Sequence, residues 1–199
     1  TYSDTGDYRN EIKQDLRSLL NKARQADYIV VCTGENSYTE TPGNTTTPEL
    51  SENQQELIKT AASSGKPVIL VLAQGRPRLI REVEPLSGAI LNAYLPGSYG
   101  GEAVARILFG ETNPSGKLPY TYPKFAYSLE PYYHKPTEAL TGVGAPEGSG
   151  FDPQYEFGFG MSYAQFSFSD LKLNQTTYTS GETLKENIKI HNHSGKTGM

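Results

Sequence analysis

Three short apolar segments, separated by stretches with a helical pattern, constrain the fold of this chain most. They are "YIVVCT" (28–33), "PVILVLA" (67–73) and "GAILNAY" (88–94), and few polar side chains interrupt them. Continuous apolar runs of this length are typical of parallel strands that are covered on both faces. We therefore expect three buried strands that run in the same direction.

Helical patterns precede, separate and follow the predicted strands. Apolar side chains recur at helical spacing over residues 8–25. A second helix is expected to begin at Ser51, where Gln54 completes a capping box, and to end before Gly65. Further helices are expected at 79–85 and 100–110. Alternating helices and strands predict βαβ units and an α/β fold with a mainly parallel sheet.

The pattern changes in the second half of the chain. Residues 111–160 are rich in Pro, Gly and Tyr, which predicts a long ordered connection with one short strand at 117–122. The segments 166–173 and 184–192 alternate apolar and polar residues, as antiparallel strands do. We interpret them as the start of a β-sandwich and the chain as a fragment. The expected domains are an α/β domain (1–123), a connecting segment (124–163) and an incomplete β-sandwich (164–199).

Charge and composition disfavour several classes of partner. The net charge of −4 does not favour nucleic acid or an anionic membrane surface. No apolar run approaches the ~18 residues that span a bilayer. The single cysteine, Cys32, is predicted to be a small buried residue of the first strand. Only His191 and His193 have a spacing that resembles a ligand pair, so neither a metal nor another cofactor is expected.

Three loops follow the carboxyl ends of the predicted strands, where ligands bind in parallel α/β sheets. They are "GENSYTETPG" (34–43), "AQGRP" (73–77) and "LPGSYGG" (95–101), and we expect them to meet at one edge. The last lacks the spacing of a phosphate-binding loop and is interpreted as a tight turn. Arg76 is expected to pair with a nearby carboxylate rather than to bind a substrate.

Glu35 and Glu40 of the first loop are candidate acid/base residues, because a carboxyl group at a strand end can transfer protons. Many exposed loop glutamates are simply hydrated, so the residues alone leave both interpretations open. A flavodoxin-like ligand-binding module and a non-catalytic carbohydrate-binding module also remain alternatives.

Four longer segments carry a resemblance to a known family. They are "ADYIVVCTGENSYTETPGN", "GKPVILVLAQGRP", "AILNAYLPGSYGGEAVARILFGETNPSGKLPYTYP" and "YEFGFGMSYAQFSFSDLKL". Together they resemble glycoside hydrolase family 3, the β-glucosidase and β-xylosidase family. The similarity is to its three-layer α/β sandwich domain, followed by the start of its fibronectin type III-like domain.

The resemblance implies a retaining, exo-acting enzyme that hydrolyses terminal non-reducing β-D-glucosyl residues of a β-glucoside or oligosaccharide. It assigns the general acid/base to Glu40 and the nucleophile to an aspartate of a preceding barrel domain, which this sequence lacks. Glu35 and Tyr38 become candidate substrate-binding residues, with structural roles as the alternatives. The resemblance further implies secretion or a periplasmic location, no cofactor, and no hydrolysis by the fragment alone.

Overall fold

The computed structural model describes residues 11, 15–128, 132–133 and 152–198. The chain divides into two compact units, each considered by itself. The first unit comprises Thr1–Gly101 and Leu118–Phe159, and the second comprises Glu102–Lys117 and Gly160–Met199. No helix in the described part of the chain is both long and apolar enough to cross a membrane.

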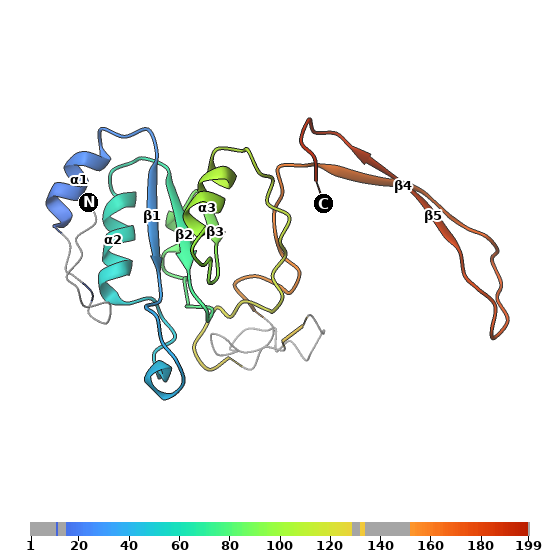
Figure 1. The fold of residues 1–199 in the computed structure, drawn as a ribbon, viewed down its shortest axis with the longest axis horizontal. Helices are drawn as coiled ribbons and strands as arrows, with labels where there is room; N and C mark the ends of the chain where they lie inside the picture. Colours follow the sequence, from blue (N-terminus) through green and yellow to red (C-terminus); the bar gives the residue numbers. More distant parts are fainter. Residues whose placement is uncertain (1–10, 12–14, 129–131, 134–151, 199) are drawn as a thin grey trace, which may run out of the picture. The chain divides into compact units, whose positions relative to one another are not determined.

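A three-stranded parallel sheet forms the centre of the first unit (Figure 1). Its strands are β1 (Ile29–Gly34), β2 (Val68–Ala73) and β3 (Ala89–Asn92), in that spatial order. Ile29 of β1 lies opposite Val68, and Ile69 of β2 lies opposite Ala89. The three predicted strands and their parallel pairing are therefore confirmed, and the carboxyl ends share one edge.

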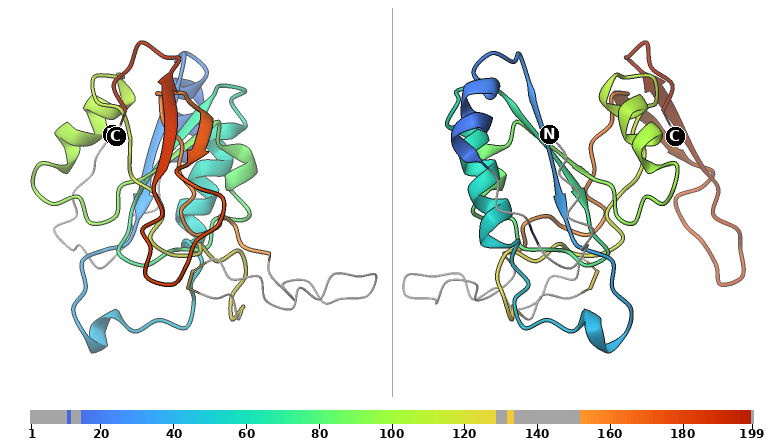
Figure 2. Two further views of the ribbon diagram at one scale, coloured as in Figure 1. Left: turned by 90° about the vertical axis from the view of Figure 1, so that its right-hand side faces the viewer. Right: turned by 60° about the vertical axis from the view of Figure 1, so that its left-hand side comes forward.

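Two helices cover one face of this sheet, α1 (Leu16–Ala23) and α2 (Glu52–Ala62) (Figure 2). Ser51 caps α2 by accepting a hydrogen bond from the Gln54 backbone amide at 3.3 Å. The reciprocal half of the predicted capping box does not form, because the Gln54 side chain binds the backbone of Gly34 instead. The sequence motif thus serves two elements, the start of α2 and the end of β1.

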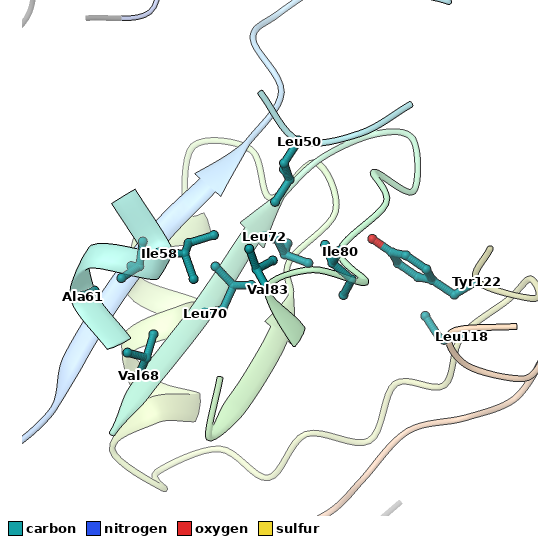
Figure 3. Close-up of a cluster of buried hydrophobic side chains, with 11 residues drawn as sticks. Leu50, Ile58, Ala61, Val68, Leu70, Leu72, Ile80, Val83, Leu118 and Tyr122 are labelled. Atoms are coloured by element: carbon teal, nitrogen blue, oxygen red, sulfur yellow. The ribbon is translucent and has the colours of Figure 1, made fainter. Parts of the chain in front are cut away.

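The core of the first unit lies between α2 and β2 and continues into the segment after β2 (Figure 3). Burying one large aliphatic side chain contributes about 1.5–3 kcal/mol. Fully or almost fully buried members are Ile58, Ala61, Val68, Leu70, Leu72, Ile80 and Val83. At one end the Tyr122 hydroxyl accepts a hydrogen bond from Gln74 and donates one to the Arg78 carbonyl, so its polar atom is satisfied.

The segment after β2 does not form the helix that was predicted at 79–85. Leu79 instead makes an isolated bridge with Glu49, and a short 3₁₀ helix follows at η2 (Glu84–Leu86). Pro85 disfavours helical backbone at the preceding residue, which limits the helix to about one turn. Ile80 and Val83 are nevertheless buried at three-residue spacing, which explains the apolar pattern that suggested a longer helix.

The environment of β1 also differs from the prediction. β2, the central strand, is largely buried, but β1 lies at one edge of the described sheet and alternates between buried and exposed positions. Cys32 is therefore exposed, as is Val30, whereas Val31 and Thr33 face the core. In the described part of the first unit only one sheet face carries helices, so the predicted coverage of β1 on both faces is not found.

Residues 117–122 do not form the short strand that was expected. They make one isolated antiparallel bridge, between Tyr122 and Tyr155. Pro119 has no backbone N–H to donate, which interrupts a strand ladder. Separate contacts join the two segments instead: Leu118 donates its backbone N–H to the Phe159 carbonyl at 2.8 Å, and the rings of Tyr122 and Tyr155 meet edge to face with their centroids 6.0 Å apart.

The second unit contains most of α3 (Gly100–Leu108) and the antiparallel pair β4 (Phe166–Leu173) and β5 (Glu186–Asn192). Gly110 follows α3 with φ 72°, and its amide binds the Ile107 carbonyl at 2.9 Å, as a helix C-terminal glycine does. The predicted antiparallel pairing of β4 and β5 is confirmed, and both strands are exposed along their length.

Candidate functional site

The loop after β1 begins with a close approach of two strand ends. Gly34 has φ 149°, and a Cβ atom there would lie 1.9 Å from the Ala73 carbonyl oxygen. The next residue, Glu35, donates its backbone N–H to the same oxygen at 2.9 Å. The Gln54 side-chain amide holds Gly34 through two hydrogen bonds of 3.0 Å each. Glycine is required here because no side chain fits between β1 and β2.

Glu35 is the centre of a charged network at the carboxyl ends of β1 and β2. Its side chain is 2% exposed, and its Oε1 lies 2.9 Å from Arg76 Nη2 and 2.8 Å from Arg78 Nε. Its Oε2 accepts hydrogen bonds from the backbone amides of Gly75 and Arg76 and from the Tyr38 hydroxyl. The predicted pairing of Arg76 with a carboxylate is confirmed, and the carboxylate is that of Glu35.

This network keeps the Glu35 carboxyl group ionised. Burial alone would raise its pKa, but the hydrogen bonds from the Arg76 backbone and side chain, the Arg78 charge and the Tyr38 hydroxyl outweigh burial and lower the pKa. Burial and the hydrogen bond to Glu35 raise the pKa of Tyr38. Glu35 therefore remains an anion and Tyr38 a neutral donor over the pH range in which most enzymes operate.

The two arginines also bind the backbone of the loop. Arg76 donates to the Gly43 carbonyl, and its Cζ lies 4.2 Å from the centroid of the Tyr38 ring. Arg78 donates to the Thr47 carbonyl at 2.6 Å. In Figure 1 the loop extends past the carboxyl end of β1, in light blue. Both of its arms are thus attached to the segment that follows β2.

Glu40 lies between these attachment points. It precedes the short 3₁₀ helix η1 (Thr41–Gly43), and its carbonyl accepts a hydrogen bond from the Gly43 amide at 2.8 Å. Its backbone has φ 51° and ψ −136°, a conformation that residues with a Cβ atom rarely adopt. Its side chain is exposed, and its carboxylate makes no hydrogen bond or ion pair with any residue that the structure describes.

An open pocket of ≈ 1050 Å³ lies beside the charged network. Glu35, Tyr38, Gly43, Arg76 and Arg78 line it together with residues at the start of α2. The loop after β3 also approaches, because a Cβ atom at Gly75 would lie 3.5 Å from the Leu95 side chain. The predicted convergence of three loops at one sheet edge is confirmed.

The sequence-predicted site residues divide into two groups. Glu35 and Tyr38 share a hydrogen bond of 3.1 Å and line the pocket, whereas Glu40 is exposed at η1 and is not among the lining residues. Sequence reasoning missed Arg78. The signal was present in "RPR", because residues two apart in an extended segment point the same way.

The residues described provide no group of three or more His, Cys, Asp or Glu side chains that could hold a metal ion. His191 and His193 of the second unit have ring centroids 4.4 Å apart, and Ser167 Oγ lies 2.6 Å from His193 Nε2. No carboxylate or cysteine joins this exposed pair among the described residues. The site at the sheet edge offers carboxylates, guanidinium groups and a phenol.

Comparisons with known proteins identify relatives of the chain. Residues 5–163 match the family model described as the glycosyl hydrolase family 3 C-terminal domain. A lysosomal beta glucosidase of Dictyostelium discoideum is 38% identical over 170 residues, which cover 84% of this chain and 20% of that protein. A periplasmic beta-glucosidase of Salmonella typhimurium is 31% identical, over 96% of this chain and 27% of that protein.

Solved structures of beta-glucosidases are also similar to this chain. The crystal structure of a beta-glucosidase from Listeria innocua in complex with isofagomine is similar with a TM-score of 0.80 and 29% identity. The similarity covers 94% of this chain and 28% of that one. Beta-glucosidase 3B from Thermotoga neapolitana in complex with glucose has a TM-score of 0.69, 28% identity and coverage of 92% and 28%. The chain thus spans roughly a quarter of the length of these relatives.

Proposed function

Because this chain belongs to glycoside hydrolase family 3 and matches the C-terminal domain of that family, we propose that it supplies the general acid/base of a retaining, exo-acting β-glucosidase-type enzyme. The proposed substrate is a β-glucoside or oligosaccharide with a terminal non-reducing β-D-glucosyl residue. The nucleophile is an aspartate of a barrel domain that is not part of these 199 residues. The observation that carries the proposal is the exposed carboxyl group of Glu40, which has no partner among the described residues, on a loop held from both sides.

Retaining hydrolysis requires two carboxyl groups about 5–5.5 Å apart. One remains ionised and attacks the anomeric carbon. The other donates a proton to the departing glycosidic oxygen and then removes a proton from the water that releases the sugar. A carboxyl group can serve as this second group only if it can reach across to another domain and hold a proton.

Glu35 meets these requirements poorly, which leaves Glu40 as the candidate. The Glu35 carboxylate is bound by two guanidinium groups, and its lowered pKa opposes the protonation that a general acid needs. Glu40 is five residues further along the loop and projects into solvent. These observations support Glu40 as the acid/base.

Glu35 and Tyr38 take different roles in this proposal. The carboxylate of Glu35 is engaged within the protein, which favours its structural role over direct sugar binding. Tyr38 is 38% exposed and lines the pocket, so the uncovered part of its ring can contact the sugar or the leaving group. Aromatic rings are suited to such surfaces because they offer an apolar face and a hydroxyl group.

The proposal also covers the cellular location of the whole protein and the domain that begins near residue 164. The periplasmic relative supports secretion or export to the periplasm. The antiparallel pair of β4 and β5 supports the start of a fibronectin type III-like domain at residues 164–199. Its exposed apolar side chains, such as Phe168 and Ile190, are what an incomplete β-sandwich would leave uncovered.

Glu40→Ala in the full-length protein tests the assignment. We expect kcat/KM to fall about 100- to 10,000-fold for phenyl β-glucoside, because its leaving group needs a proton. Dinitrophenyl β-glucoside leaves without that proton, so its cleavage should be much less affected. Added azide should accelerate turnover of the variant and form β-glucosyl azide. Azide, unlike water, can attack without a general base to deprotonate it.

Glu56→Ala provides the matched control, because Glu56 is an exposed glutamate of α2 in the same unit. That variant should hydrolyse both substrates at the wild-type rate. A Glu40→Ala protein that cleaves phenyl β-glucoside normally would remove Glu40 from the role.

A further inference from the structure

We infer that Arg76, anchored by Glu35, is a positioning residue that holds the Glu40 carboxyl group in the orientation for proton transfer. The inference rests on the proposed function of Glu40. It assigns to the charged network at the ends of β1 and β2 a role in the reaction, although neither Arg76 nor Glu35 contacts the reacting atoms.

Arg76 contacts the loop on both sides of Glu40. Its guanidinium group stacks over the ring of Tyr38, two residues before Glu40, with Cζ 4.2 Å from the ring centroid. The same group donates a hydrogen bond to the carbonyl of Gly43, three residues after Glu40. One planar side chain therefore joins the two arms of the turn that presents Glu40.

The two arms also pack directly against each other. A Cβ atom at Gly43 would lie 2.3 Å from Tyr38 Cδ2, so the Gly43 backbone rests on the edge of the Tyr38 ring. The absence of a side chain at Gly43 permits this contact and brings its carbonyl within reach of Arg76. The turn is thus closed by a layer that comprises the Gly43 backbone, the Tyr38 ring and the Arg76 guanidinium group.

Glu35 fixes the direction of Arg76. Its carboxylate is 2% exposed, and it binds Arg76 through Nε, Nη2 and the backbone amide. It also binds the Tyr38 hydroxyl, the second component of the layer. Arginine matches a carboxylate through several parallel hydrogen bonds, which lysine cannot reproduce. The anchor therefore defines the position of the guanidinium group and not merely its charge.

The backbone of Glu40 explains why such a layer is needed. A residue with φ 51° and ψ −136° is strained, and it persists only when its surroundings hold it. Without the layer the turn would relax and carry the carboxyl group away from its working position. Proton transfer is sensitive to this change, because a displacement of about 1 Å can cost about 100-fold in rate.

The test compares Arg76→Lys with wild type in the full-length protein and uses the same two aryl β-glucosides. Lysine keeps the charge but loses the stacked, multidentate geometry. We expect kcat/KM for phenyl β-glucoside to fall about 10- to 100-fold, with little change for dinitrophenyl β-glucoside. Arg106→Lys is the matched control, because Arg106 forms an exposed i,i+4 pair with Glu102 on α3, and it should change neither rate.

A double-mutant cycle with Glu40→Ala distinguishes positioning from a general structural role. If Arg76 acts through Glu40, adding Arg76→Lys to the Glu40→Ala variant should cause no further fall of kcat/KM that depends on the leaving group. If Arg76→Lys does not fold, Tyr38→Leu in the same cycle carries the test, because it removes the stacked ring and its hydroxyl but leaves the contacts between Glu35 and Arg76 in place. A contact between Tyr38 and the leaving group would persist in the Glu40→Ala background and so would be recognised.

Two results would overturn the inference alone. One is an equal fall of kcat/KM for both substrates in Arg76→Lys, and the other is an additive fall of kcat/KM in the double variant. In both cases the Glu40→Ala variant itself must be severely slowed. An ordinary rate for Glu40→Ala would instead overturn the proposed function, and the inference with it. The two failures are therefore distinguishable.

Discussion

At the scale of single residues, two glutamates five positions apart acquire different chemistry from their surroundings. Glu35 is enclosed by arginines and backbone amides, which favour its ionised form. Glu40 extends from a strained turn and has no partner among the described residues. The sequence presents both as loop carboxyl groups, and only their environments separate an anchor from a candidate acid.

Glu35→Gln should destabilise the protein, because two guanidinium groups lose their counter-charge. The free energy of unfolding should fall by about 2 kcal/mol. This lies between the ~1 kcal/mol of an exposed ion pair and the ~3–5 kcal/mol of a fully buried one. A carboxyl group with a lowered pKa contributes stability above its ordinary pKa, and this contribution disappears as the pH falls through its lowered pKa in the folded state. The difference between wild type and Glu35→Gln should therefore be largest near neutral pH and shrink below about pH 4.

Denaturant unfolding of both proteins, measured from neutral to acid pH, checks this prediction. Glu102→Gln is the control, because its pair with Arg106 is exposed on both sides and should contribute less than about 1 kcal/mol at any pH. A Glu35→Gln protein with wild-type stability at neutral pH would contradict the anchoring role of this carboxylate.

At the scale of secondary-structure elements, the end of β1 determines where the loop begins. Gly34 passes so close to Ala73 that the two strand ends are fixed against each other. Gln54 of α2 adds a side-chain clamp to the same residue. The loop that carries Glu40 therefore starts from a rigid junction of three elements, which suits a site that has to be held in place.

Gly34→Ala should severely destabilise the protein and impair its hydrolytic activity. The added Cβ atom would lie 1.9 Å from a backbone oxygen of β2, which cannot move without breaking the sheet. Gly101→Ala is the matched control: nothing lies within 4 Å of the position, and alanine is favoured over glycine in a helix by about 0.5–1 kcal/mol. Thermal unfolding should show a much lower melting temperature for Gly34→Ala and no decrease for Gly101→Ala.

At the scale of the whole molecule, the proposed chemistry is divided between domains. The full-length protein should hydrolyse aryl β-glucosides, whereas these 199 residues alone should not, because a retaining mechanism needs both carboxyl groups. Parallel assays of the two proteins with dinitrophenyl β-glucoside check this expectation. Hydrolysis by the shorter protein would mean that it contains its own nucleophile and would contradict the proposed division.

Local pattern was sufficient for the α/β class, the three parallel strands, the helices at α2 and α3 and the antiparallel pair of β4 and β5. These features follow from side-chain periodicity and from the residues that begin or end each element, which act over a few neighbouring positions. The meeting of three loops at one sheet edge was also predictable, since it follows from parallel strand direction. Glu35, Tyr38 and Glu40 were named as candidates from the sequence and the family resemblance.

Only the tertiary structure decided what each of these residues contacts. Cys32 is exposed because it lies on the face of β1 that carries no helix in the described part of the first unit, and an apolar run cannot reveal which faces of its strand are covered. The side chain of Gln54 does not complete the predicted capping box but donates a hydrogen bond to Gly34, twenty residues earlier. Arg76 and Arg78 meet Glu35 across more than forty residues of sequence. Burial and long-range pairing arise when distant segments pack together. They decide that the Glu35 carboxylate is held by two arginines, whereas that of Glu40 has no partner among the described residues.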